Sequence, residues 1–232
     1  MTALLPRALG ILSLDQGQDP AETYASGSIQ STGSAYLPRI DEIVEGALVE
    51  RVVRGDLALE PAYVAAAKRL VERGAVAISS DCGYTIRYQK AVASSVNVPV
   101  AMSSLLLLPT LIRQSPPSAK IGIVTFDSTC FGDGLLGLHD PAEKDRVVVG
   151  GIEGSKYWHD ERKHAAPPAD VAALEADISA RIAWLRAAHP EIAIILFECT
   201  GFAPVAPAIR RITQLPVYDI YLLRSLLASS VG

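Results

Sequence analysis

The feature that most limits what this chain can fold into is an internal duplication. The segment LGILSLD (residues 9–15) resembles IGIVTFD (residues 121–127), and both are short apolar runs that end in an aspartate. Two later strand-and-helix segments also recur in the same order, and the cysteine of one and the proline of the other repeat at the same spacing. We therefore expect two similar halves, residues 1–114 and 115–232, related by a pseudo-two-fold axis, with the C-terminal end free to return to the first half.

Apolar segments rich in Ile and Val alternate with longer Ala/Leu/Arg segments of helical period, which is typical of parallel α/β folds. Core strands are expected at 8–14, 75–79, 98–102, 120–125, 192–197 and 216–218. Helices are expected at 60–73, 84–96, 103–114, 169–188, 203–212 and 220–227. Ligands of open parallel sheets bind beyond the carboxyl ends of the strands, so we predict a site in a cleft between the two halves.

Charge and hydropathy exclude several classes of protein. The 25 acidic and 21 basic residues give a formal charge of -4 without a long run of either sign, so neither a nucleic-acid track nor a polybasic membrane patch is indicated. Residues 1–14 lack a cleavage pattern, and the apolar stretch at 102–112 is shorter than the roughly 20 residues of a spanning helix. We expect a cytoplasmic protein with a small-molecule substrate and no nucleic-acid or membrane partner.

Three cysteines, an odd number, predict individual thiols in a reducing compartment rather than a disulfide framework. No CxxC or HxxxH spacing occurs, so no metal site is expected. Two of the cysteines follow an acidic residue at the end of an expected strand, in Asp81-Cys82-Gly83-Tyr84 and Glu198-Cys199-Thr200-Gly201. A nearby helix N-terminus lowers the pKa of a thiol, so Cys82 and Cys199 are the candidate acid and base.

Two opposed thiols suit the inversion of a carbon next to a carboxylate, because one removes a proton and the other delivers one. The intermediate gains negative charge and needs hydrogen-bond donors. The candidate donors are the backbone N–H groups of Gly83, Tyr84, Thr200 and Gly201 and the hydroxyls of Thr125, Ser128 and Thr200. Asp15, with Gln16 beside it, and Asp127 either orient the thiols or hold a substrate ammonium, or they cap the turns that follow.

With these cysteines and repeats, the sequence resembles the aspartate/glutamate racemase superfamily, which includes amino-acid racemases, hydantoin racemases, maleate isomerases and arylmalonate decarboxylases. The resemblance covers nearly the whole chain. It is carried by the segments GILSLD, SSDCGYTIRYQKAVASSVNVPVAMSSLLLLP, IGIVTFDS and FECTGFAPVAPAIRRITQLPVYDI. It implies two three-layer α/β/α subdomains with mainly parallel sheets, a substrate between them, no cofactor, one catalytic thiol from each half and a homo-oligomer.

The motif residues depart from those of amino-acid racemases. Such racemases usually have Asn-Thr after the first cysteine and Thr-His or Thr-Glu after the second, whereas this chain has Gly83-Tyr84 and Thr200-Gly201. The bulkier Tyr84 and Phe202 either suit a hydrophobic or cyclic substrate or pack into the core. A decarboxylase-like member would keep only the second cysteine, so the presence of both favours racemisation or another two-thiol isomerisation.

The leading interpretation is a cofactor-independent isomerase, a racemase of amino acids, hydantoins or related compounds. One alternative is a maleate isomerase-like or decarboxylase-like enzyme that acts on a diacid through a covalent or single-thiol mechanism. Another is a redox or ligand-binding protein without catalysis. Cys130 has no partner in the repeat and is expected to be structural, with a redox sensor as the alternative. Residues 17–38 are expected to form a mobile flap, and residues 150–168 a long loop bordering the cleft or an oligomer contact.

Overall fold

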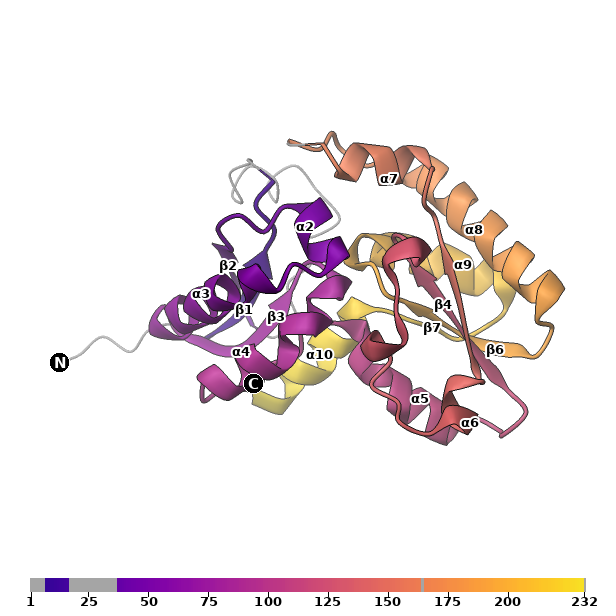
Figure 1. The fold of residues 1–232 in the computed structure, drawn as a ribbon, viewed down its shortest axis with the longest axis horizontal. Helices are drawn as coiled ribbons and strands as arrows, with labels where there is room; N and C mark the ends of the chain where they lie inside the picture. The colour runs from indigo at the N-terminus through magenta and orange to yellow at the C-terminus, as the bar shows by residue number, and fades with distance from the viewer. Residues whose placement is uncertain (1–6, 17–36, 164, 232) are drawn as a thin grey trace. The chain divides into compact units, whose positions relative to one another are not determined.

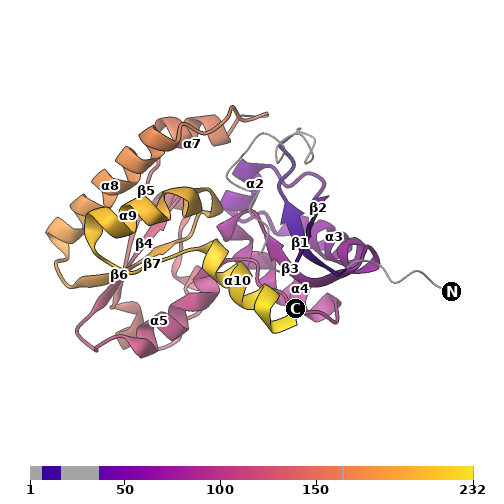
Figure 2. The same cartoon turned by 180° about the vertical axis from the view of Figure 1, so that it is seen from behind.

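The computed structural model of the chain describes residues 7–16, 37–163 and 165–231. It comprises two compact units (Figures 1 and 2). The first unit contains the described residues up to Ser103 and the C-terminal segment from Tyr221, and the second runs from Ser104 to Ile220. The chain therefore enters the second unit once and returns from it. The expected flap at 17–38 falls almost entirely outside the described residues.

The first unit is built on a parallel sheet with the strand order β2-β1-β3. Its strands are β1 (Ala8–Ser13), β2 (Arg39–Ile43) and β3 (Ala75–Ser80). Its helices are α2 (Val49–Arg54), α3 (Glu60–Glu72), α4 (Gln89–Ser95) and α10 (Ile220–Val231), with 3-10 turns η1 (Leu57–Leu59) and η2 (Gly83–Tyr88). Helix α3 packs on all three strands, and its buried face supplies Tyr63 and Leu70 to the core.

The second unit has a four-stranded parallel sheet with the order β5-β4-β6-β7. Its strands are β4 (Lys120–Thr125), β5 (Val147–Gly151), β6 (Ile192–Phe197) and β7 (Val217–Tyr218). Its helices are α5 (Leu108–Gln114), α6 (Pro141–Lys144), α7 (Lys156–Glu161), α8 (Val171–Ala188) and α9 (Ala206–Thr213). Its 3-10 turns are η3 (Ser104–Leu107), η4 (Ser128–Cys130), η5 (Asp133–Leu135) and η6 (Thr200–Val205).

The two units repeat one pattern of strand pairing. In the first, Ala8 pairs with Ala75 and the register then shifts, so that Leu9 faces Ala77. In the second, the same shift separates the pair of Lys120 and Ile192 from the pair of Ile121 and Ile194. Since a register irregularity belongs to one particular place in a ladder, its recurrence supports a common origin of the two sheets. The α/β class, the parallel sheets and the two-subdomain organisation predicted from the sequence are confirmed.

Three local predictions were wrong. Residues 98–102 form only an isolated bridge between Ile78 and Val100, because Pro99 brings no N–H to a ladder. Strands β2 and β5 were missed, since both lie at sheet edges and lack a continuous buried apolar run. Residues 150–168, expected to be a loop, contain the end of β5 and all of α7. Three predicted helices also begin with 3-10 turns, and two of these turns directly follow Cys82 and Cys199.

Each unit has an apolar core around two adjacent strands, β1 and β3 in the first unit and β4 and β6 in the second. Strand β1 is buried along its whole length, and β3, β4 and β6 are each buried at five of their six residues. A strand covered on both faces reads as a continuous apolar run, which is why these four were predictable. In the part of the chain that the structure describes, no helix is long and apolar enough to cross a membrane.

Candidate functional site

The two cysteines occupy equivalent positions in the two units. Strand β3 ends at Ser80 and β6 at Phe197, and in each case a carboxylic acid and then a cysteine follow. Cys82 is the N-cap residue of η2, and Cys199 is the N-cap residue of η6. Each thiol is partly exposed. Both therefore stand at the carboxyl end of a buried strand, as the sequence predicted, one in each unit.

The turn after each cysteine closes with the same hydrogen bond. The Thr85 backbone N–H donates to the Cys82 carbonyl at 3.2 Å, and the Phe202 N–H donates to the Cys199 carbonyl at 3.2 Å. The residues between, which supply the predicted backbone donors, are buried: Gly83, Tyr84, Thr200 and Gly201. In each unit a helical turn, whose first N–H groups carry a partial positive charge, thus begins directly after the cysteine.

The carboxylates before the cysteines are anchored in the same way. Asp81 accepts hydrogen bonds from the Leu14 backbone N–H at 3.1 and 3.2 Å, while its own N–H donates to the Leu12 carbonyl at 3.2 Å. Glu198 accepts from the Phe126 N–H at 3.3 Å and donates its own N–H to the Val124 carbonyl at 2.9 Å. Both side chains are buried. These carboxylates tie the cysteine turns to the neighbouring central strands.

Asp81 lies in a low-dielectric environment beside two cations. Burial raises the pKa of its carboxyl from 3.8 to about 6, while Arg39 and Arg224 act in the opposite direction. Arg224 comes from α10, is 3% exposed, and donates to the Ser80 carbonyl at 2.5 Å and to the Ser79 hydroxyl at 3.3 Å. A C-terminal arginine thus supports the strand end that carries Cys82.

A negative charge on Cys82 contributes to raising the pKa of two tyrosines, Tyr63 and Tyr88. The rings of Tyr63 and Tyr88 stack with centroids 4.5 Å apart. Burial, followed by the negative charges of Cys82 and Asp81, raises the pKa of Tyr63 well above its ordinary value. Burial also raises the pKa of Tyr88 to about 12. Both phenols therefore keep their protons at neutral pH.

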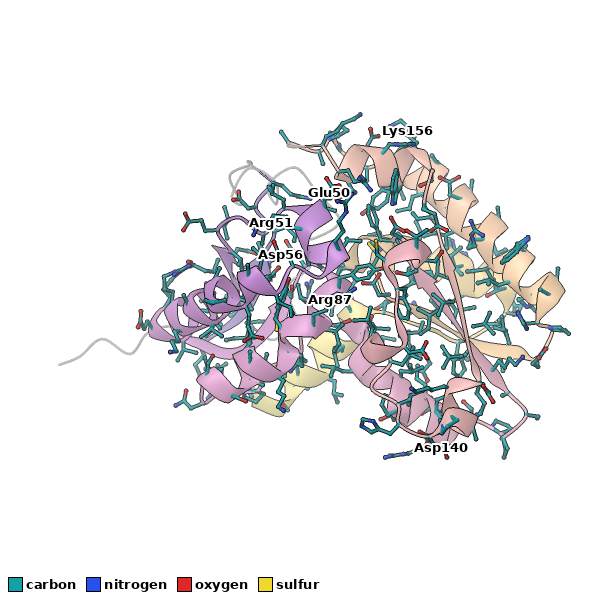
Figure 3. The ribbon with its side chains drawn as sticks, in the orientation of Figure 1. Glu50, Arg51, Asp56, Arg87, Asp140 and Lys156 are labelled. Carbon is teal, nitrogen blue, oxygen red and sulfur yellow. The ribbon has the colours of Figure 1, made fainter. Side chains whose placement is uncertain are left out.

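The two phenols differ in their hydrogen bonds. The Tyr88 hydroxyl donates to the Asp56 carbonyl at 2.8 Å. The side chain of Asp56 forms an ion pair with Arg51, and these two residues are labelled in Figure 3. The fully buried Tyr63 hydroxyl has no hydrogen-bond partner among the residues that the structure describes.

Cys199 has different neighbours. A Cβ atom at Gly201 would overlap the Tyr157 hydroxyl and would lie 3.7 Å from the Cys199 sulfur. Tyr157 belongs to α7, and its ring packs against Phe126 at 6.4 Å and Phe202 at 6.0 Å between centroids. A glycine at position 201 thus leaves room for a tyrosine hydroxyl close to this thiol.

Two of the three predicted hydroxyl donors, Thr125 and Ser128, are bonded to carboxylates inside the second unit. Thr125 donates to Glu198 at 2.8 Å, and Ser128 donates to Glu153 at 2.7 Å. A hydroxyl has a single proton to donate, so in this arrangement both protons stabilise protein carboxylates. Thr125 and Ser128 therefore hold the ends of neighbouring strands together.

The two predicted aspartates accept hydrogen bonds from backbone N–H groups. Asp127 caps η4 by accepting from the Thr129 N–H at 3.0 Å, and it also accepts from the Trp158 indole at 3.0 Å. Asp15 accepts from the Gly46 N–H at 3.0 Å, and Gln16 beside it is partly exposed. Capping of the following turn, one of the two roles weighed, is thus observed for Asp127, whereas Asp15 bonds the backbone of a distant turn and the residues after Gln16 lie outside the described ranges.

Cys130 ends η4 and is partly exposed, and its sulfur lies 3.8 Å from the Thr129 hydroxyl oxygen. Within the described ranges, no group of three or more His, Cys, Asp or Glu side chains is arranged to hold a metal ion.

Sequence reasoning missed Tyr157, Trp158, Tyr63 and Arg224. The tyrosine and tryptophan were noticed only as members of an expected loop, and a helical start signal was present in Ser155, which caps α7 by accepting from the Trp158 N–H at 3.1 Å. Tyr63 and Arg224 are separated by many residues from Cys82 and carry no local signal.

Curated proteins of similar sequence share one activity in their names. No family model matches the chain. It is 31% identical over 226 residues to a dimethylsulfoniopropionate lyase of Durusdinium sp. clade D, covering 91% of this chain and 71% of that protein. It is 29% identical to dimethylsulfoniopropionate lyase 3 of Emiliania huxleyi, covering 96% of this chain and 59% of that protein. The chain thus spans about three fifths to seven tenths of the length of these two relatives.

Solved structures agree with the fold at much lower sequence identity. A glutamate racemase of Francisella tularensis has a TM-score of 0.58 and 14% identity, covering 98% of this chain and 81% of that one. An allantoin racemase of Pseudomonas fluorescens has a TM-score of 0.56 and 20% identity, with coverages of 95% and 89%. The Gly74Cys variant of an arylmalonate decarboxylase has a TM-score of 0.56 and 16% identity, with coverages of 98% and 95%. These likenesses concern the fold.

Proposed function

Because this chain belongs to the family of dimethylsulfoniopropionate lyases and has the fold of aspartate/glutamate racemases, we propose that it removes a proton from a carbon next to a carboxylate and expels a leaving group from the neighbouring carbon. The favoured substrate is dimethylsulfoniopropionate or a related sulfonium carboxylate. The observation that carries the proposal is the N-cap position of Cys82 and Cys199, each after a buried carboxylate at the end of a buried strand. We assign the catalytic thiols to these two residues.

The proposed reaction is a β-elimination. A cysteine thiolate takes the proton from the carbon next to the carboxylate, and the electron pair of the broken C–H bond forms a carbon–carbon double bond. The C–S bond of the sulfonium breaks, and its electron pair leaves with neutral dimethyl sulfide. The products are acrylate, dimethyl sulfide and the proton now on the thiol, so atoms and charge balance without an oxidant or reductant.

Elimination shares its first half with the racemisation expected from the sequence. Both begin with proton removal from the carbon next to a carboxylate, which needs a base and nearby hydrogen-bond donors for the growing negative charge. They diverge afterwards, because a racemase returns a proton to the opposite face whereas a lyase loses its leaving group. The relatives' names favour elimination, since these curated proteins are called lyases.

The first experiment offers dimethylsulfoniopropionate to the purified chain and measures dimethyl sulfide in the headspace and acrylate in solution. We expect equimolar products. Of Cys82→Ser and Cys199→Ser, the variant that removes the base should lose at least about 100-fold in turnover. Cys130→Ser is the matched control and should keep the activity. Full turnover in both Cys82→Ser and Cys199→Ser would refute the assignment of the thiols.

Racemisation remains the second candidate, favoured by the presence of two equivalent thiols rather than one. It predicts uptake of solvent deuterium at the carbon next to the carboxylate of chiral amino acids, hydantoins or substituted acids, with no small product released. Mass spectrometry of substrate recovered from D2O separates the two reactions. Deuterium uptake into such substrates, together with no release of dimethyl sulfide, would favour the racemase over the lyase.

A further inference from the structure

The two cysteine turns are equal in length but differ at their second residue. In η2 this residue is Tyr84, whose side chain is 1% exposed, and in η6 it is Gly201. The space that a side chain at position 201 would need is taken by the Tyr157 hydroxyl from α7. The second unit thus places beside its thiol a tyrosine hydroxyl that comes from a distant part of the chain.

Several hydrogen bonds hold α7 in place within the second unit, and they restrain the position of the Tyr157 hydroxyl. Ser155 caps the helix, and the Trp158 indole donates to Asp127 at 3.0 Å. Just before α7, Glu153 accepts from both the backbone and the hydroxyl of Ser128. These contacts connect α7 to the end of β4, which is hydrogen-bonded to β6.

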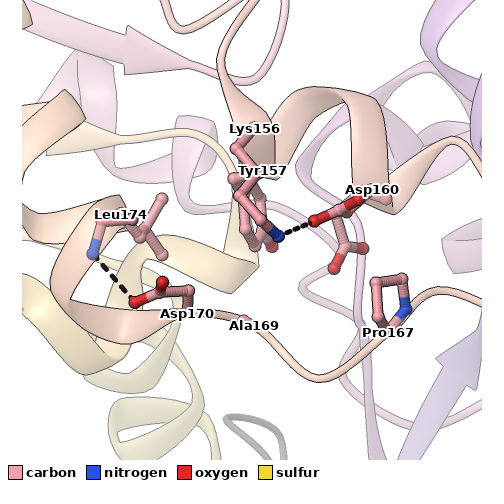
Figure 4. A pocket seen from close by; sticks show the side chains of 9 residues that line it. Lys156, Tyr157, Asp160, Pro167, Ala169, Asp170 and Leu174 are labelled. Atoms are coloured by element: carbon pink, nitrogen blue, oxygen red, sulfur yellow. Dashed lines mark hydrogen bonds and ion pairs between the residues drawn. The ribbon is translucent and has the colours of Figure 1, made fainter.

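The ring of Tyr157 packs against two other aromatic rings. Phe126 meets it edge-on, with an interplanar angle of 76°, and Phe202 is tilted against it at 60°. Tyr157 also lines a pocket with Lys156, Asp160 and Leu174, shown in Figure 4. The side chain is only 9% exposed, and its hydroxyl reaches Gly201. A ring packed in this way cannot turn its hydroxyl away from Gly201 without disturbing the aromatic cluster.

We propose that Tyr157 is a positioning residue for Cys199. The Tyr157 hydroxyl, held over Gly201, stabilises the Cys199 thiolate and keeps its sulfur in place as a base. The role of Cys199 as a base in this proposal rests on the proposed function. A phenol proton near a thiolate favours the charged sulfur, since hydrogen bonds to an ionised group are among the stronger ones. Gly201 is required because any side chain there would displace the hydroxyl.

The test measures the thiol directly and needs no substrate. Tyr157→Phe removes only the hydroxyl, and iodoacetamide alkylation of the Cys199 peptide is followed by mass spectrometry from about pH 6 to about pH 9 in the whole chain, since only the thiolate reacts. We expect alkylation of Cys199 to slow by about tenfold at the acidic end, which corresponds to one pKa unit, and to approach the wild-type rate at the alkaline end. The alkylation profile of the Cys82 peptide should stay unchanged.

Tyr218→Phe is the matched control, because it removes the hydroxyl at which Gln114 donates a hydrogen bond at 3.0 Å elsewhere in the same unit. It should leave the Cys199 profile as in the wild type. Gly201→Ala provides a second variant, since its Cβ pushes the Tyr157 hydroxyl away and should slow alkylation in the same direction. Thermal unfolding of each variant shows that the fold is kept.

A Cys199 profile in Tyr157→Phe identical to that of the wild type would overturn the assignment, as would an equal change in Tyr218→Phe. A failure to turn over dimethylsulfoniopropionate would count against the proposed function and leave the alkylation result standing. If turnover is found, Tyr157→Phe should shift the acidic limb of the pH profile of kcat/KM to higher pH, because the free enzyme's base then needs a higher pH to ionise.

Discussion

At the scale of single residues, the acidic side chain before each cysteine carries a physical cost. Asp81 is buried, and a buried carboxylate loses the hydration that water would give its charge. Two backbone contacts from Leu14 and the nearby Arg224 offset that loss in part, yet the pKa of Asp81 still stands at about 6. The same residue links the Cys82 turn to the end of β1, so the free-energy cost of burying its carboxylate accompanies the positioning of Cys82.

This raised pKa predicts a pH dependence of stability. The folded state holds the Asp81 proton up to about pH 6, whereas the unfolded chain releases it near 3.8. The free energy of unfolding should therefore fall as pH rises through this window, by about 3 kcal/mol in all, and stay level above it. Asp81→Asn keeps an acceptor oxygen for the Leu14 N–H and should abolish this contribution. Urea unfolding at a series of pH values measures it.

Asp56→Asn is the matched control for that experiment. The ion pair with Arg51 lowers the pKa of Asp56, so its folded-state value lies below its unfolded one. Its contribution to stability is then present above the unfolded value and is lost as pH falls, which is the opposite sign to Asp81. A pH slope of Asp81→Asn identical to that of the wild type between 3.8 and about 6 would show that Asp81 is not the group responsible.

At the scale of secondary-structure elements, a glycine in each central strand allows close packing. A Cβ at Gly10 in β1 would lie 3.0 Å from the Ala75 Cβ and 3.0 Å from Leu70 of α3. Gly122 is in the equivalent position of β4, where a Cβ would lie 3.1 Å from Ile195. These glycines are needed for the approach of neighbouring side chains.

We therefore expect Gly10→Ala to destabilise the protein by about 1–3 kcal/mol, as overpacking of a core does. The Ala75 Cβ is attached directly to the backbone of β3 and cannot rotate away, so the strand or α3 must shift. Gly132→Ala is the control, because a Cβ there would meet nothing within 4 Å. Chemical denaturation of both variants decides the matter, and equal stabilities would contradict the packing argument.

At the scale of the whole molecule, the path of the chain connects its C-terminal end to the first unit. Helix α10 follows β7 of the second unit, yet from Tyr221 it is part of the first (Figures 1 and 2). It buries Leu223, Leu227 and Ala228, and its Arg224 supports the end of β3. The first unit is thus completed only after the second has been made.

It follows that a fragment that ends at residue 114 should not fold cooperatively, since it lacks α10 and leaves the Ser80 carbonyl and Asp81 without Arg224. Circular dichroism with urea unfolding should show a weak, broad transition or none. Supplying residues 221–232 as a peptide or a fused segment should sharpen the transition. A cooperative transition of the bare fragment, unaltered by the added segment, would show that α10 is dispensable.

Much of the fold could be predicted because the duplicated segments are local and apolar. Strands β1, β3, β4 and β6 are buried, so their runs of Ile, Val, Leu and Ala are visible in the sequence, and the cysteine after each later strand is visible too. Edge strands β2 and β5 were not predicted, because their residues are partly exposed and show no regular alternation of apolar and polar side chains. Helix α7 was not predicted, because it is only six residues long and lies between segments rich in glycine and proline.

The amino-acid sequence by itself determined the α/β class, the two halves and the place of Cys82 and Cys199 at strand ends, because hydrophobic periodicity and repetition act over a few neighbouring residues. Only the tertiary structure decided what surrounds each thiol. Tyr63 and Tyr88 come to Cys82 from within the first unit, and Tyr157 comes to the Cys199 turn from α7. These neighbours are brought together by packing over long sequence separations, which no local pattern of residues records.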